Sequence, residues 1–144
     1  MNDDQLIARA LQCCERRVIG QELRSPLDTY NYLRLKVGAL PYEVFGCVWL
    51  DTQHRVLHCA ELFRGTVSQT AVYPREVIRE AMAWNAAAVI LYHNHPSGMP
   101  EPSAADRLLT ESLKTALGYV DVVVLDHVIV TTGKCASFAE RGWL

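Results

Sequence analysis

The 144-residue sequence has little surplus charge and no long hydrophobic run. Fourteen basic residues against sixteen acidic ones give a formal net charge of -2, so the basic surface that a nucleic-acid backbone or an anionic membrane attracts is missing. No apolar stretch approaches the roughly 20 residues that a membrane-spanning helix needs. We therefore expect neither nucleic acid nor a membrane as a partner of this chain.

The five cysteines are odd in number and show no C-x-x-C spacing, which argues against a disulfide framework. The sequence begins MNDDQ, which is acidic where a secretory signal peptide is basic. Together these features indicate a cytoplasmic protein with reduced thiols. Because half of the 144 residues are hydrophobic, the chain can bury a core of its own, and we expect one domain.

Helical periodicity and β-branched runs alternate along the chain, which predicts an α/β domain with a mixed β-sheet packed between helices. The predicted helices cover residues 3–17, 27–37, 74–87 and 103–117, and the predicted strands cover residues 43–50, 55–63, 66–72, 88–92, 120–126 and 127–130. The apolar stripe of the third helix runs from Val77 to Asn85. Residues 1–25 are interpreted as a helical arm that precedes the main domain, residues 26–144.

Two of the five histidines, His93 and His95, come one residue apart after the apolar run AVILY. Side chains alternate along a strand, so both rings are expected side by side at its end. Asp106 begins the buried stripe of the following predicted helix, and the turn PSGMPEP connects the two elements. Two imidazoles and one carboxylate leave a tetrahedral metal one open position for water, as in catalytic zinc sites.

Each of these residues also has an ordinary structural interpretation. The spacing from Ser103 to Asp106 is a variant of the capping box, and a histidine at a strand's end is commonly held by hydrogen bonds. Two histidines and a carboxylate also bind ferrous iron, so ligand type leaves the metal open. The H-E-x-x-H signature and the zinc deaminase signature are absent from the sequence.

Glu43, the sequence HNHP at residues 93–96, Ser103 and Asp106 resemble the JAMM (MPN+) metallopeptidase signature. Three longer stretches are similar to the RadC branch of that superfamily: LFRGT, VYPREVIREAMAWNAAAVILYHNHPSG and DHVIV. The resemblance covers roughly residues 26–144. It implies a cytidine-deaminase-like JAMM (MPN) architecture and the hydrolysis of an amide bond.

The resemblance implies one Zn²⁺ per chain, held by His93, His95 and Asp106, and a peptide or protein substrate. It makes Glu43 the general base that takes a proton from the bound water. Glu43 shares an expected strand face with apolar residues, which favour a protonated carboxyl. Glu61 is the alternative base, and an exposed residue at a strand's start is the ordinary interpretation of Glu43.

By the same resemblance Ser103 would offer its hydroxyl to the oxyanion of the reaction, and its ordinary role is to cap the helix. Asp126 and His127 match the RadC stretch but are interpreted as a turn residue and a hydrogen-bonded histidine. The resulting prediction is a zinc-dependent metallohydrolase of the metallopeptidase or isopeptidase type. A noncatalytic metal-binding interaction module and a DNA-repair-associated protein are the alternatives, and the sequence leaves the oligomeric state open.

Overall fold

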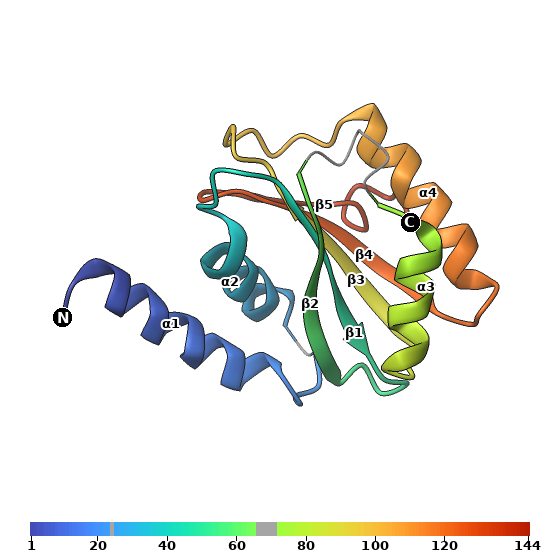
Figure 1. Cartoon of the computed structure of the whole chain (residues 1–144), viewed down its shortest axis with the longest axis horizontal. Helices are drawn as coiled ribbons and strands as arrows, with labels where there is room; N and C mark the ends of the chain where they lie inside the picture. Colours follow the sequence, from blue (N-terminus) through green and yellow to red (C-terminus); the bar gives the residue numbers. More distant parts are fainter. Residues whose placement is uncertain (24, 66–71) are drawn as a thin grey trace.

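Five strands form a mixed sheet in the order β2-β1-β3-β4-β5, with β3 and β4 parallel and the other neighbours antiparallel (Figure 1). The computed structural model describes residues 1–23, 25–65 and 72–144. The strands are β1 (Val44–Leu50), β2 (Val56–Arg64), β3 (Ala88–Asn94), β4 (Val123–Val130) and β5 (Cys135–Ser137). The helices are α1 (Asp3–Val18), α2 (Pro26–Val37), α3 (Pro74–Ala83) and α4 (Ala104–Gly118).

Helices cover both faces of the sheet, because the central strands are apolar on both sides. Phe45, Cys47 and Trp49 of β1 share a hydrophobic cluster with buried residues of α3 and α4. The alternate residues Val44 and Val48 belong to a second cluster that contains the buried side chains of α2. Figure 1 shows α3 and α4 on one side of the sheet and α2 on the other. The predicted α/β fold, a mixed sheet between helices, is confirmed.

Two predictions about elements are wrong, and one short strand was not predicted. Helix α3 ends at Ala83 instead of residue 87, because Asn85 adopts a left-handed conformation with φ of 51° and leaves the helix. The two strands predicted at residues 120–126 and 127–130 are the single strand β4, so there is no turn at Asp126. Strand β5, which has three residues, was not predicted. The strand predicted at residues 66–72 falls almost entirely on residues 66–71, which lie outside the described residues.

Helix α1 joins the fold through its C-terminal half. Leu11, Cys14 and Val18 pack into the cluster that contains α2. The N-terminal half extends beyond α2 into solvent (Figure 1). The division of the chain at residue 25 remains a prediction. In the parts of the chain that the structure describes, no helix combines the length and the hydropathy needed to cross a membrane.

Candidate metal centre

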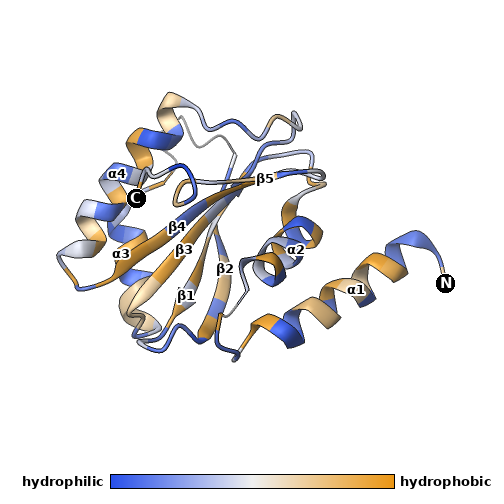
Figure 2. Ribbon diagram, turned by 180° about the vertical axis from the view of Figure 1, so that it is seen from behind, coloured by the Kyte–Doolittle hydropathy of each residue, from blue (hydrophilic) through white to orange (hydrophobic). Residues whose placement is uncertain are grey.

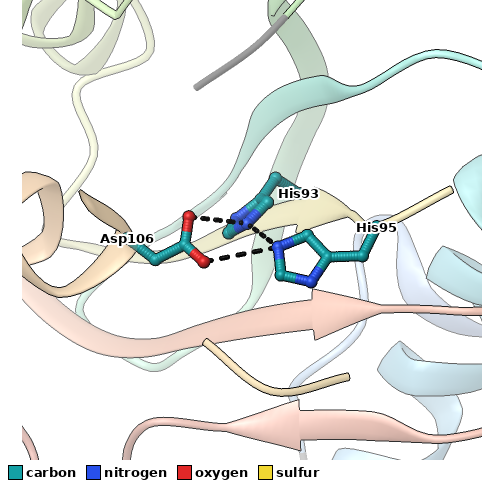
Figure 3. A group of neighbouring side chains, drawn as sticks. All are labelled: His93, His95 and Asp106. Atoms are coloured by element: carbon teal, nitrogen blue, oxygen red, sulfur yellow. Dashed lines mark hydrogen bonds and ion pairs between the residues drawn. The ribbon is translucent and has the colours of Figure 1, made fainter. Parts of the chain in front are cut away.

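Strand β3 and helix α4 bring His93, His95 and Asp106 together, and their side chains point toward one another (Figure 3). The two histidine Nε2 atoms lie 3.0 Å apart. Asp106 Oδ1 lies 3.1 Å from His93 Nε2, and Asp106 Oδ2 lies 3.3 Å from His95 Nε2. The His93 and Asp106 side chains are 0% and 3% exposed and that of His95 is 14% exposed, so the cluster meets solvent beside His95.

Asp106 caps its helix and belongs to the histidine cluster at the same time. Its Oδ2 accepts a hydrogen bond from Ser103 N at 2.7 Å, and its own N–H donates to Ser103 Oγ at 3.1 Å. Burial alone would raise the pKa of Asp106, but the hydrogen bonds that His93 and His95 donate when their rings carry a proton on Nε2 outweigh it and hold this pKa well below the usual range. The capping box therefore fixes an ionised carboxylate against two imidazoles, and the two interpretations of Asp106 do not exclude each other.

The His95 ring is oriented by the turn that follows it. His95 Nδ1 lies 2.9 Å from the carbonyl oxygen of Met99. Because a carbonyl can only accept, Nδ1 carries the hydrogen, and a neutral His95 ring presents the Nε2 lone pair to the cluster. The hydrogen bond with Asp106 raises the pKa of His95 against the effect of burial, and the Met99 carbonyl and the charges of Asp106 and Glu43 add to the rise.

The His93 ring is oriented by a buried chain of hydrogen bonds. His93 Nδ1 lies 2.8 Å from His127 Nε2, and His127 Nδ1 contacts Thr110 Oγ1. The Thr110 hydroxyl donates to the Asp106 carbonyl oxygen at 2.7 Å, so its one hydrogen is used and His127 Nδ1 must be the donor toward Thr110. Burial lowers the pKa of His127 well below its usual value and keeps its ring neutral. His127 Nε2 then accepts from His93 Nδ1, so a neutral His93 ring turns its Nε2 lone pair toward the cluster.

The donor set fits a zinc ion. Four ligands at 2.0–2.1 Å in tetrahedral geometry lie about 3.3 Å from one another. The two histidine Nε2 atoms lie 3.0 Å apart, and each lies 3.1 or 3.3 Å from the nearer of the two Asp106 carboxylate oxygens. One ligand atom from each of the three residues lies within 4.8 Å of the others. Histidine ligands usually donate their second ring N–H to a protein acceptor, as His95 does to Met99 and His93 does to His127.

Asn94, between the two histidines, points to the opposite side of β3 and holds the chain around Glu43. Its Oδ1 accepts from Val44 N at 2.7 Å, and its Nδ2 donates to the Tyr42 carbonyl oxygen at 2.9 Å. Glu43, half-buried just before β1, is the residue between these two contacts, and its charge acts on His95. The H-N-H sequence therefore places both the histidine pair and the neighbouring glutamate.

The other predicted site residues lie in different surroundings. Ser103 is exposed at the N-cap of α4, next to Asp106. Glu61, the alternative base, is an exposed residue of β2 and forms an ion pair with Arg64 at 3.1 Å. Its carboxylate is thus engaged outside the histidine cluster, whereas the charge of Glu43 reaches His95.

Asp126 lies inside β4, so its interpretation as a turn residue is wrong, whereas the interpretation of His127 as a hydrogen-bonded histidine is confirmed. They point to opposite faces of the sheet. Asp126, paired in register with Ile90, accepts hydrogen bonds from His127 N and Ser137 Oγ. His127 is completely buried behind His93. The sequence signal for His127 was a histidine within the apolar run of β4.

Residues 23–143 match the sequence model of the RadC-like JAB domain. This chain belongs to the RadC family of JAB-domain proteins. The resemblance to RadC that the motifs carry is confirmed, and the mixed sheet between helices has the JAB (MPN) architecture. The family assignment adds weight to the histidine cluster as a possible metal site, but a fold does not by itself specify a reaction.

Similar proteins carry the name UPF0758, which states no activity. A UPF0758 protein of Chromobacterium violaceum is 51% identical over 140 residues, which are 97% of this chain and 62% of the relative. One from Methylibium petroleiphilum is 58% identical over 120 residues, or 83% of this chain and 54% of the relative. One from Vibrio cholerae is 51% identical over 144 residues, 99% of this chain and 90% of the relative. The chain thus spans little more than half the length of several relatives.

Proposed function

We propose that this RadC-family chain is a zinc-dependent metallohydrolase that cleaves an amide bond in a peptide or protein. The observation that carries the proposal is the convergence of two imidazole Nε2 atoms and the Asp106 carboxylate, with both rings oriented through Nδ1. Glu43, whose two neighbours in sequence are held by Asn94 between the histidines, is the carboxylate that this proposal assigns to the reaction. The activity is proposed for the cytoplasm, and no nucleic acid or membrane is part of it.

The protein residues divide the chemistry among them. A zinc ion with three protein ligands keeps a fourth position for water and lowers the pKa of that water toward ~7. Glu43 would take the proton that the attacking water loses and pass it to the departing nitrogen. Ser103 Oγ accepts from Asp106 N, so its hydroxyl hydrogen remains for the oxygen of the scissile carbonyl as negative charge develops there.

Cleavage is tested with the zinc-loaded chain and a mixture of peptides, with mass spectrometry to detect new amino termini. Replacing the proposed base in the variant Glu43→Gln should preserve zinc binding and lower the cleavage rate by about 100-fold or more. The matched control is Glu61→Gln, which removes the alternative carboxylate and should leave the rate unchanged. A loss of rate in Glu61→Gln instead would transfer the role of base to Glu61.

The same assay distinguishes the alternatives. If the zinc-loaded chain cleaves no more than Glu43→Gln does, the noncatalytic metal-binding module replaces the hydrolase. Binding to DNA that weakens steeply with added salt would favour an association with DNA repair. The net charge of -2 opposes that result.

A further inference from the structure

The N-terminal half of α1 exposes an apolar surface that no other described residue covers. Leu6 and Ile7 are 53% and 50% exposed, and Ala10 is exposed beside them. The residues that pack on α2 lie further along the helix, at Leu11 and Cys14. Figure 2 shows hydrophobic and hydrophilic residues alternating along α1 where it projects from the body of the fold. This surface is independent of the metal centre and of the proposed reaction.

Charges of opposite sign stand at the two ends of the same helix. Asp3 and Asp4 lie in its first turn, and Arg16 and Arg17 lie in its last turn. Asp3, Leu6, Ala10 and Arg17 are separated by three, four and seven residues, so they follow one side of the helix. Ala10 is the centre of this row, because Asp3 precedes it by seven residues and Arg17 follows it by seven.

We propose that α1 is the contact surface between two copies of this chain, which pair antiparallel across a two-fold axis beside Ala10. Asp3 and Arg17 each lie about 10 Å from Ala10 along the helix, so the antiparallel pair places Asp3 of one copy opposite Arg17 of the other. A symmetric interface of this kind uses the same patch on both copies. Parallel pairing would instead bring Asp3 against Asp3 and Arg17 against Arg17.

Pairing of the two α1 helices buries the apolar side chains that are exposed in the single chain. Leu6 and Ile7 of each copy would lie against the partner helix near its C-terminal half, and Ala10 would allow the two backbones to approach closely. The opposed helix dipoles add a favourable contribution in the antiparallel arrangement only. The occupant of this surface is therefore a second copy of the chain.

Sedimentation equilibrium of the full chain over a wide concentration range tests the pairing. The wild type should be a dimer, and Leu6→Glu should raise its dissociation constant by at least about tenfold, because the buried leucine is lost from both copies. The matched control is Ala8→Glu, which adds the same charge on the opposite side of α1 and should leave the constant unchanged. If the circular dichroism spectrum and the zinc content are equal in all three proteins, misfolding is excluded as the cause of a weaker dimer.

Charge exchange tests the antiparallel direction. Asp3→Arg and Arg17→Asp should each weaken the dimer, and the two changes in one chain should restore it, because the pair of opposite charges is rebuilt in reversed order. A double variant as weak as the single ones would overturn the proposed direction.

A cysteine placed on the two-fold axis tests the register. In a background with Cys13→Ser, the variant Ala10→Cys should form a disulfide-linked dimer under mild oxidation, since its two copies face each other. Ala8→Cys, on the other side of the helix, should not. A chain that stays monomeric at every concentration overturns the proposal, and sedimentation of that monomer with anionic vesicles would assign the surface to a membrane instead.

Discussion

The end of β3 and the N-terminal half of α1 differ in whether the chain itself provides the interaction partners of their side chains. At the end of β3, polar groups are buried, and His93, His127 and Asn94 each have their hydrogen-bond partners within the chain. Along α1, apolar side chains such as Leu6 and Ile7 remain in water without partners in the described structure. Buried polar groups that are fully paired hold a fixed geometry, which a metal requires, whereas exposed apolar groups are free to meet another molecule.

The comparison predicts that the protein loses stability when one hydrogen-bonding side chain at the end of β3 is removed. Asn94→Ala leaves the buried Val44 N–H and the Tyr42 carbonyl without a hydrogen bond, so the free energy of unfolding should fall by about 1–3 kcal/mol for each group left unpaired. Urea denaturation measures the loss. The variant Asn94→Asp keeps an acceptor for Val44 N but sets a buried carboxylate against the Tyr42 carbonyl oxygen, so it should be no more stable than Asn94→Ala. An unchanged stability in Asn94→Ala would show that these contacts do not hold the strand.

A second prediction concerns the orientation of the His93 ring. His127→Phe keeps the stacking on Phe138 but removes the acceptor for His93 Nδ1, and zinc affinity should fall about 10- to 100-fold. Competition with a chromophoric chelator measures this change. His127→Gln offers an oxygen near the position of Nε2, so part of the affinity should return. Equal affinities in His127→Phe and the wild type would contradict the orienting role.

The smallest effect on zinc binding is expected from a change in α1, because α1 and the metal centre are independent. Leu6→Ser removes an exposed apolar side chain of α1 far from the cluster, and the zinc content and zinc affinity of the chain should not change. Elemental mass spectrometry and the same chelator competition check this. A lowered affinity in Leu6→Ser would show that the arm and the metal centre are coupled, and the contrast between the two regions would disappear.

Local patterns in the sequence were enough to predict much of the fold and the positions of the central residues. Alternation along a strand placed His93 and His95 together, and helical spacing placed Asp106 in line with the buried residues of α4. Both patterns depend on neighbours within a few residues. Whether these three residues bind a metal, and whether Glu43 and Ser103 act in catalysis, remain predictions.

Contacts between distant segments were not predictable in the same way. Asn94 bonds to Val44, fifty residues earlier, and His127 reaches His93 only because β4 lies parallel to β3. Interpreting Asp126 as a turn residue followed from taking β4 as two strands, since nothing in the local pattern requires one continuous strand. The pairing of strands, which decides these contacts, is a property of the whole fold.

Metal content is the most direct test of the account. The chain, purified without metal-affinity chromatography, should contain about one zinc per molecule by elemental mass spectrometry, as a site with three protein ligands requires. The double variant His95→Ala, Asp106→Ala should contain none while remaining folded. A wild type that binds no metal even when zinc is supplied at neutral pH would mean that the two histidines and Asp106 are a structural cluster, and the proposed hydrolase would have no basis.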